Sequence, residues 1–326
     1  MLDKMKLNRI FSKEREYTIL LQGVINPKTF NLWIKNYSDY KVVVSIWEDE
    51  DLSNYDIPTN WKVVLNKYPL VRFRKEANLD YQIITTLAGL KEVDDMWVIK
   101  MRTDEYYSKL DKVFDKMKSN PEKIVSSSMF FREYGMYKFH CSDKLLGGSV
   151  ENLTGMFEST LHNLQLKLWD ETIPESQLGL GYVMLKDSKF NVSNINNKRS
   201  EFREQFVEEH GIKLFTKASN AISTEMMNIL TNEFINNNDK IDWEGVTNSV
   251  GRWKTILGEC LNVVNKHTNE FIDDRPYMKK WFEIIDINQL KPYIATRNFG
   301  DKRGRVWYNN NFDNKKENCV SDIKKY

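Results

Sequence analysis

The sequence predicts an α/β fold, in which helices cover both faces of a largely parallel sheet, followed by a mainly helical C-terminal region. Short unbroken apolar runs alternate with helical patterns through the first half of the chain. Unbroken apolar strands are expected where both faces of a sheet are covered, which favours a three-layer βαβ-type domain. Beyond residue 150 longer amphipathic segments replace the strand patterns. We therefore expect a first domain over residues 1–190 and a helical region over 191–326, ending in a polar tail, that packs on it.

The expected strands share a β-branched, apolar composition and end at glycine, acidic or other polar residues. They lie at residues 17–23, 41–47, 61–66, 96–101 and 123–128. Between them, the segment 77–93 has helical periodicity, with one apolar face and one polar, uncharged face that carries Asn78 and Gln82. That polar face is either solvated, with Asn78 as the N-cap, or it faces a ligand.

Composition excludes several classes of function. The chain has 326 residues and a net charge of +2, which predicts no nucleic-acid partner. Its three cysteines are far apart, which fits neither a disulfide framework nor a cysteine zinc site and favours a reducing, cytoplasmic location. No apolar run reaches the roughly 18 residues of a membrane span, so we expect at most peripheral membrane contact. The sequence leaves the oligomeric state open.

Polar residues follow the expected strands at the edge where open α/β sheets bind ligands. Gln22 and Gly23 end the first strand, Glu48 follows the second, and Arg102, Thr103 and Asp104 follow the fourth. An acid that ends a buried strand offers an oxygen ligand for Mg²⁺ or Mn²⁺, so Asp104 is a candidate metal ligand. The alternative is that Thr103 and Asp104 cap a helix over residues 106–117.

Several segments, in order, resemble the WavE-type lipopolysaccharide-synthesis family, glycosyltransferases with the nucleotide-sugar-binding fold called GT-A. They are "ILLQGVI", "VVVSIWEDE", "NLDYQIITTLAGLKEV", "VIKMRTDEYY", "FHCSDKLLGG" and "PESQLG", and the resemblance covers roughly residues 17–185. It implies a GT-A-like domain and transfer of a sugar from a nucleotide-sugar donor to a glycan acceptor. The acceptor would be a surface polysaccharide, a lipopolysaccharide or a glycoprotein glycan.

In this resemblance "RTD" stands where GT-A enzymes carry an Asp-x-Asp motif, so Asp104 would hold Mn²⁺ or Mg²⁺ on the donor diphosphate. Arg102 replaces the first acid of that motif, which leaves metal dependence open. A guanidinium could contact a phosphate directly, or it could form a structural ion pair. Gln22, Gly23 and Glu48 would hold the base and ribose, although Glu48 could equally be a solvated charge.

The resemblance also proposes residues for the chemical step. Glu175 is preferred over Asp143 as the base that deprotonates the acceptor hydroxyl, a role needed only if the reaction inverts configuration. Otherwise Glu175 is an ordinary first-turn glutamate. His140 would complete a metal shell or touch the acceptor, or it is structural.

Two other functions remain open from the sequence. A sugar nucleotidyltransferase would be expected to carry a glycine-rich phosphate loop after its first strand, and "QGVINPK" offers a single glycine. A glycan-binding protein whose catalytic site has decayed would explain Arg102 in place of an acid. The donor sugar, its base, the acceptor and the linkage cannot be read from the sequence.

Overall fold

The structure is a computed structural model that describes residues 16–70, 78–128, 131, 138–166, 168, 173–206 and 273–294. The chain divides into two compact units, and nearly all described residues belong to the first. The second unit includes residues 191–273, and its described helix is α7 (Val192–Phe206). The predicted boundary at residue 190 coincides with one break between the units. The first unit resumes at Asp274, a return that the sequence did not indicate.

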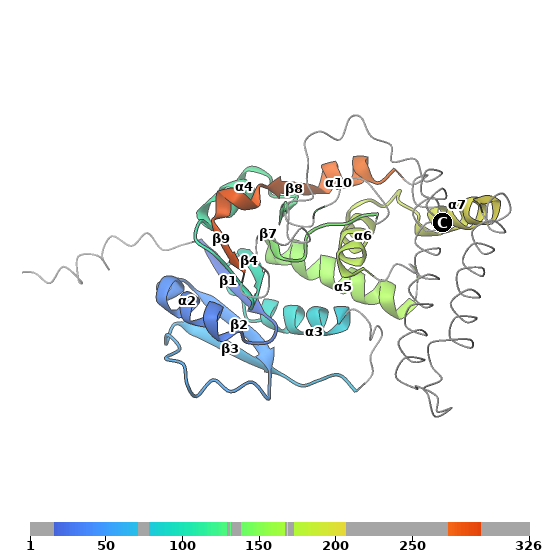
Figure 1. The fold of residues 1–326 in the computed structure, drawn as a ribbon. Coiled ribbons are helices and arrows are strands. Elements are labelled where there is room, and N and C mark those ends of the chain that lie inside the picture. Colours follow the sequence, from blue (N-terminus) through green and yellow to red (C-terminus); the bar gives the residue numbers. More distant parts are fainter. Residues whose placement is uncertain are drawn as a thin grey trace, which may run out of the picture. The chain divides into compact units, whose positions relative to one another are not determined.

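A central seven-stranded sheet organises the first unit (Figure 1). Its strand order is β3-β2-β1-β4-β7-β6-β8, and β7 is antiparallel to its neighbours β4 and β6. The strands are β1 (Tyr17–Gln22), β2 (Val42–Trp47), β3 (Trp61–Asn66), β4 (Trp97–Arg102), β6 (Ile124–Ser127), β7 (Leu145–Ser149) and β8 (Phe282–Ile285). Because β1 lies between β2 and β4 and is parallel to both, their carboxyl ends meet at one edge.

Helices cover both faces of this sheet. They are α2 (Pro27–Tyr37), α3 (Leu79–Leu90), α4 (Asp111–Ser119), α5 (Val150–Leu166), α6 (Pro174–Lys186) and α10 (Arg275–Trp281), with a short 3₁₀ helix, η3 (Ile287–Leu290). One core cluster packs Trp33 of α2 and Val113 of α4 against Ile19 and Ile99 of the sheet. On the opposite face, Gly89 of α3 packs so closely on Leu20 that an added Cβ would lie 2.4 Å from the Leu20 Cδ1.

The predicted α/β class with a GT-A-like, three-layer layout is confirmed, since the first four strands take the order β3-β2-β1-β4 between helical layers. Each of the five predicted strands is present, with ends that differ by one residue or less from the prediction. Most of the predicted helical C-terminal region lies outside the described residues.

The expected helix over residues 106–117 is wrong at its start. Residues Glu105–Tyr107 form a short strand, β5, which pairs with β9 (Pro292–Ile294), and the helix begins only at Asp111 after the N-cap Leu110. Thr103 and Asp104 therefore cap no helix. Their side chains make tertiary contacts instead, and these contacts build the site described next.

Candidate active site

A cavity of about 520 Å³ lies beyond the carboxyl ends of β1, β2 and β4, the edge predicted from the strand exits. Its walls come from the loop after β1, the end of β2, the start of α3, the end of β4, the segment before β7, and the start of α6. The lining residues are Gln22, Gly23, Val24, Ile25, Asn26, Trp47, Asn78, Tyr81, Gln82, Arg102, Thr103, Asp104, Asp143, Pro174 and Glu175.

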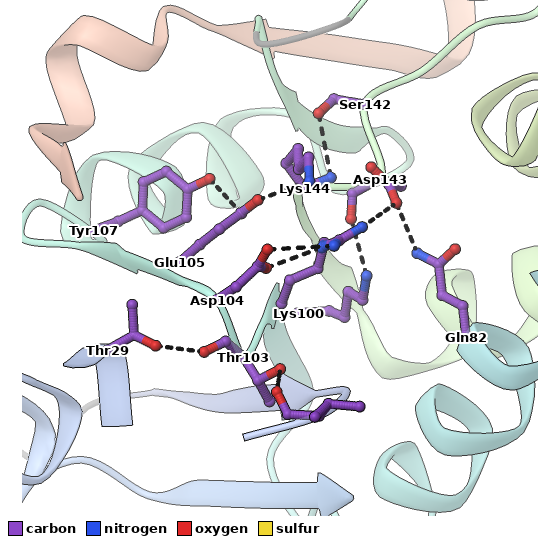
Figure 2. A network of polar contacts seen from close by, with 12 residues as sticks. Thr29, Gln82, Lys100, Thr103, Asp104, Glu105, Tyr107, Ser142, Asp143 and Lys144 are labelled. Atoms are coloured by element: carbon purple, nitrogen blue, oxygen red, sulfur yellow. Dashed lines mark hydrogen bonds and ion pairs between the residues drawn. The ribbon is translucent and has the colours of Figure 1, made fainter. Parts of the chain in front are cut away.

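Hydrogen bonds fix the loop after β1 to the end of β4. Gly23 has a φ of 121°, and a Cβ there would lie 2.9 Å from the Thr103 Oγ1, so both the backbone conformation and the close approach require glycine. The Thr103 hydroxyl donates to the carbonyl of Val24, and the Thr29 hydroxyl donates to the carbonyl of Thr103 (Figure 2). This part of the cavity wall is therefore fixed without any ligand.

Aromatic rings form one wall of the cavity. Trp47, at the end of β2, and Tyr81, in the first turn of α3, both line it, with their ring centroids 5.0 Å apart in an edge-to-face contact. Behind them the ring of Tyr68 stacks on Trp47 at 4.3 Å and donates its hydroxyl proton to Asp49. Trp47 is buried, so its position is set by packing rather than by solvent.

Arg102 lies between two aspartates that line the same cavity. Its Nε donates to the Asp104 Oδ1 at 3.1 Å and its Nη2 to the Asp104 Oδ2 at 3.3 Å. Its Nη1 donates to the Asp143 Oδ2 at 3.4 Å, an oxygen that also accepts from the Gln82 Nε2 at 3.3 Å. The guanidinium thus joins the exit of β4 to the segment before β7.

A second charged cluster lies behind the first and is closed to solvent. The Lys144 Nζ is 3.2 Å from the Glu105 Oε1, with side-chain exposures of 4% and 0%, and the Tyr107 hydroxyl donates to the Glu105 Oε2 at 2.7 Å. Burial raises the pKa of Glu105, an effect that the charge of Lys144 opposes. Lys100, also fully buried, donates to the carbonyl of Asp143 at 2.9 Å, and burial lowers its pKa to about 8.

The two carboxyl groups predicted for the chemical step have opposite pKa shifts. Burial alone would raise the pKa of Asp143, but the charges of Lys144, Arg102 and Lys100 hold it well below its usual range. Burial and the negative charge of Asp143 raise the pKa of Glu175 to about 7. Near neutral pH, Asp143 is therefore ionised while Glu175 can take up or release a proton.

The cavity brings together most of the predicted site residues, namely Gln22, Gly23, Asn78, Gln82, Arg102, Thr103, Asp104, Asp143 and Glu175. Asn78 is the N-cap of α3, but its side chain makes no capping hydrogen bond and its φ is 51°. Two predicted residues are not among the lining residues. Glu48 is exposed beyond β2, where its backbone N–H donates to the carbonyl of Asn66, and His140 is buried. The roles assigned to all of these residues stay predictions.

Three of the four oxygens of Asp104 and Asp143 are engaged by other side chains, and the fourth, the Asp143 Oδ1, is buried, an arrangement that does not favour the predicted metal. Both oxygens of Asp104 accept from Arg102, and the Asp143 Oδ2 accepts from Arg102 and Gln82. Among the described residues, no group of three or more His, Cys, Asp or Glu side chains is arranged to hold a metal ion. The second predicted ligand, His140, is outside the cavity lining.

Sequence reasoning missed the aromatic wall. Tyr81 lies on the same face of the helix as Asn78 and Gln82, so the helical spacing contained the signal. Trp47 ends an apolar strand, where an aromatic residue is most simply interpreted as core. Within the described residues, no helix has the length and apolar character needed to span a membrane.

Comparisons with known proteins agree with the resemblance seen in the sequence. The family model described as WavE lipopolysaccharide synthesis matches residues 34–269, which extends past the roughly 17–185 covered by the sequence segments but begins after Gln22 and Gly23. No curated protein matches the chain.

Solved structures of low similarity also match. HddC from Yersinia pseudotuberculosis complexed with GMP-PN has 13% identity over 42% of this chain and 78% of its own, with a TM-score of 0.27. Mouse xyloside xylosyltransferase 1 has 9% identity over 53% of this chain and 83% of its own, with a TM-score of 0.33. S. aureus TarS 1-349 has 12% identity over 90% of this chain and 99% of its own, with a TM-score of 0.32.

Proposed function

Because the chain belongs to the WavE lipopolysaccharide-synthesis family, we propose that it is a glycosyltransferase that moves a sugar from a nucleotide-sugar donor to a glycan acceptor. The observation that carries this proposal is a single cavity in which Arg102 lies beside two carboxyl groups, Asp143 and Glu175, with opposite pKa shifts. A site for glycosyl transfer needs a nucleotide pocket, a positive charge for the leaving diphosphate and a base. The cavity offers a candidate for each.

The nucleotide has room beside the aromatic wall. A volume of about 520 Å³ falls within the roughly 300–1,000 Å³ of small-molecule sites. The rings of Trp47 and Tyr81 offer an apolar surface for a nucleobase, and the side-chain amides of Gln22 and Asn78 can donate to and accept from its edge or from the ribose. A nucleoside bound here would leave its diphosphate near Arg102.

Among the described residues that line the cavity, Arg102 is the single lysine or arginine. During transfer the bond between the anomeric carbon and the diphosphate oxygen breaks, and its electron pair moves onto the diphosphate. A fixed guanidinium in a partly enclosed site stabilises that developing negative charge without having to reorient. Asp104 and Asp143 hold the guanidinium from two sides, so they act as positioning residues for Arg102.

Glu175 is the proposed base. As its carboxylate, it accepts the proton of the acceptor hydroxyl while that oxygen forms a bond to the anomeric carbon. A pKa of about 7 suits the role, since a base works best when its pKa is near the working pH. Asp143 is a poor base because nearby cations stabilise its ionised form. Attack from the side opposite the leaving group gives inversion of configuration.

A donor panel tests the proposal. Purified protein is incubated with UDP-, GDP-, CMP- and TDP-sugars, with and without a glycan acceptor, and is scored by thermal shift and by release of the nucleotide. We expect one class of donor to raise the melting temperature and to be turned over. If nucleoside triphosphate and sugar 1-phosphate react instead, the protein is a nucleotidyltransferase. If glycans bind and no donor does, the protein is a glycan-binding protein and the proposal is wrong.

A further inference from the structure

We propose that Arg102 takes the place of a divalent cation on the donor diphosphate, so that the sugar nucleotide binds without any metal ion. This inference rests on the proposed function and deepens it, because it states how the site recognises the diphosphate. It departs from the Mn²⁺ or Mg²⁺ that the family resemblance implied for Asp104.

Arg102 contacts three of the four carboxylate oxygens of Asp104 and Asp143, and the fourth, the Asp143 Oδ1, is buried. The side-on contact of Arg102 uses both oxygens of Asp104, at 3.1 and 3.3 Å, and its Nη1 contacts the Oδ2 of Asp143. Metal ions of the Mg²⁺ type bind through one or two carboxylates and the substrate phosphates. For a divalent cation to reach Asp104, the guanidinium would have to leave it, which would separate a partly buried pair of opposite charges.

Arg102 also keeps hydrogen-bond donors for a ligand. A guanidinium has five N–H groups in a fixed planar arrangement, and the contacts to Asp104 and Asp143 use three of them. The Arg102 side chain is 38% exposed and lies on the cavity surface, whereas Asp104 and Asp143 are 12% and 6% exposed. The remaining N–H groups can therefore meet phosphate oxygens, for which guanidinium geometry is well suited.

The surrounding charges keep Arg102 in this position. Lys100 and Lys144 lie behind Asp143 and lower its pKa, so Asp143 remains ionised and holds the guanidinium at neutral pH. Gln82 donates to the same Asp143 oxygen from α3, which fixes the carboxylate from a third direction. Arg102, oriented by Asp104 and Asp143, thus supplies the positive charge that a bound metal ion would otherwise supply to the diphosphate.

The first test uses the wild-type protein and needs no variant. UDP, GDP, CDP and TDP are titrated by isothermal calorimetry in EDTA and again in MnCl₂ or MgCl₂, and Mn²⁺ alone is titrated in a separate run. We expect one nucleoside diphosphate to bind with a dissociation constant that changes by less than about twofold between the conditions. We also expect no binding of Mn²⁺ alone.

Three outcomes separate this inference from the proposed function. Tight binding in EDTA supports both. Binding that requires Mn²⁺, or that strengthens about tenfold or more with it, overturns the metal-free inference and leaves the glycosyltransferase proposal standing. If no nucleoside diphosphate binds under any condition, the proposed function fails and the inference fails with it.

Variants of Arg102 sharpen the result. Arg102→Lys keeps the charge but loses the fork of donors, and we expect nucleoside diphosphate to bind on the order of tenfold to a hundredfold more weakly, with the nucleoside alone unchanged. Arg102→Asp supplies the missing acid beside Asp104, and we expect its nucleotide binding to become dependent on Mn²⁺. Arg275→Lys, outside the cavity lining, is the matched control. An Arg102→Lys protein that binds as the wild type does would contradict the inference.

Discussion

Two clusters of opposite charges lie next to each other at the carboxyl edge of the sheet, and they differ in what surrounds them. In the inner cluster, Glu105, Lys144 and Tyr107 are buried and bind one another. In the outer cluster, Arg102 lies between Asp104 and Asp143, and its side chain remains 38% exposed on a cavity. Similar side chains are therefore found in two settings: the inner cluster is closed to solvent, and the outer cluster lines the cavity in which we propose that the donor binds.

The largest expected effect is on the stability of the inner cluster. Lys144→Met leaves Glu105 charged and buried without its partner, so we expect a loss of about 3–5 kcal/mol in the free energy of unfolding. Urea denaturation followed by circular dichroism measures it. The exposed pair of Lys62 with Asp94 provides the control, since Lys62→Met should change stability little. The double variant Glu105→Gln/Lys144→Met should recover part of the loss. Equal losses of stability in Lys144→Met and Lys62→Met would contradict the expected difference between the buried and the exposed ion pair.

The next effect is on turnover of the donor in the cavity. Glu175→Gln removes the proposed base while keeping the size of the side chain, and we expect turnover of the donor to fall by about 10²–10⁴-fold with donor affinity retained. Steady-state kinetics and calorimetry on the same preparation separate the two quantities. Glu151→Gln is the matched control, because Glu151 is likewise the second residue of a helix, α5, but is not among the lining residues of this cavity. Unchanged turnover in Glu175→Gln would remove Glu175 from the mechanism.

A smaller effect is expected at the aromatic wall. Tyr81→Ala removes a ring that lines the cavity, and loss of base stacking should weaken nucleotide binding by about 1–3 kcal/mol. Tyr68→Ala removes a ring of the same stack that is not among the lining residues, so it should leave the nucleotide dissociation constant unchanged. Fluorescence titration with the nucleoside diphosphate compares the two. If both variants weaken binding equally, the stack acts through packing and not through contact with the base.

The last effect concerns the pH dependence of stability. The pKa of Glu175 rises from 4.5 to about 7 on folding, so between these values the folded protein keeps a proton that the unfolded chain has released. This group therefore makes the protein less stable as pH rises through that window, and Glu175→Gln should be less sensitive to pH there. Thermal melts from pH 4 to 8 measure the difference. Turnover by the wild type should rise with pH through about 7, as the carboxylate forms.

The part of the molecule that the sequence predicts well is the first four strands and the site at their ends. Unbroken apolar runs mark these strands, and in a parallel arrangement their polar exits must meet at one edge, so Gln22 and Arg102 could be brought together in advance. The sequence did not predict strand β7, because this strand contains Gly147 and Gly148 and glycine is depleted in strands. Gly147 is needed there, since an added Cβ would lie 2.8 Å from the Met117 Sδ of α4.

The contacts of Arg102 could not be predicted in the same way. Its position at the end of β4 allowed either a phosphate contact or a structural ion pair. The choice depends on Asp143, which lies 41 residues further along the chain, just before the strand β7 that pairs with β4. The pKa of Asp143 likewise depends on burial and on the charges of Lys144, Arg102 and Lys100, and the pKa of Glu175 depends on burial and on the charge of Asp143. Such quantities follow from tertiary packing and have no local signal.

The last described strands have a consequence for how the chain is made. β8 pairs with β6 at the sheet edge, and β9 pairs with β5, so that Ile294 lies opposite Glu105 in the register. A ribosome must therefore synthesise the chain as far as residue 294 before the backbone next to the inner cluster can be paired. Contacts this distant in sequence slow folding. Until then β6 presents an open edge, and a nascent chain of this protein should depend on chaperones for as long as that edge stays unpaired.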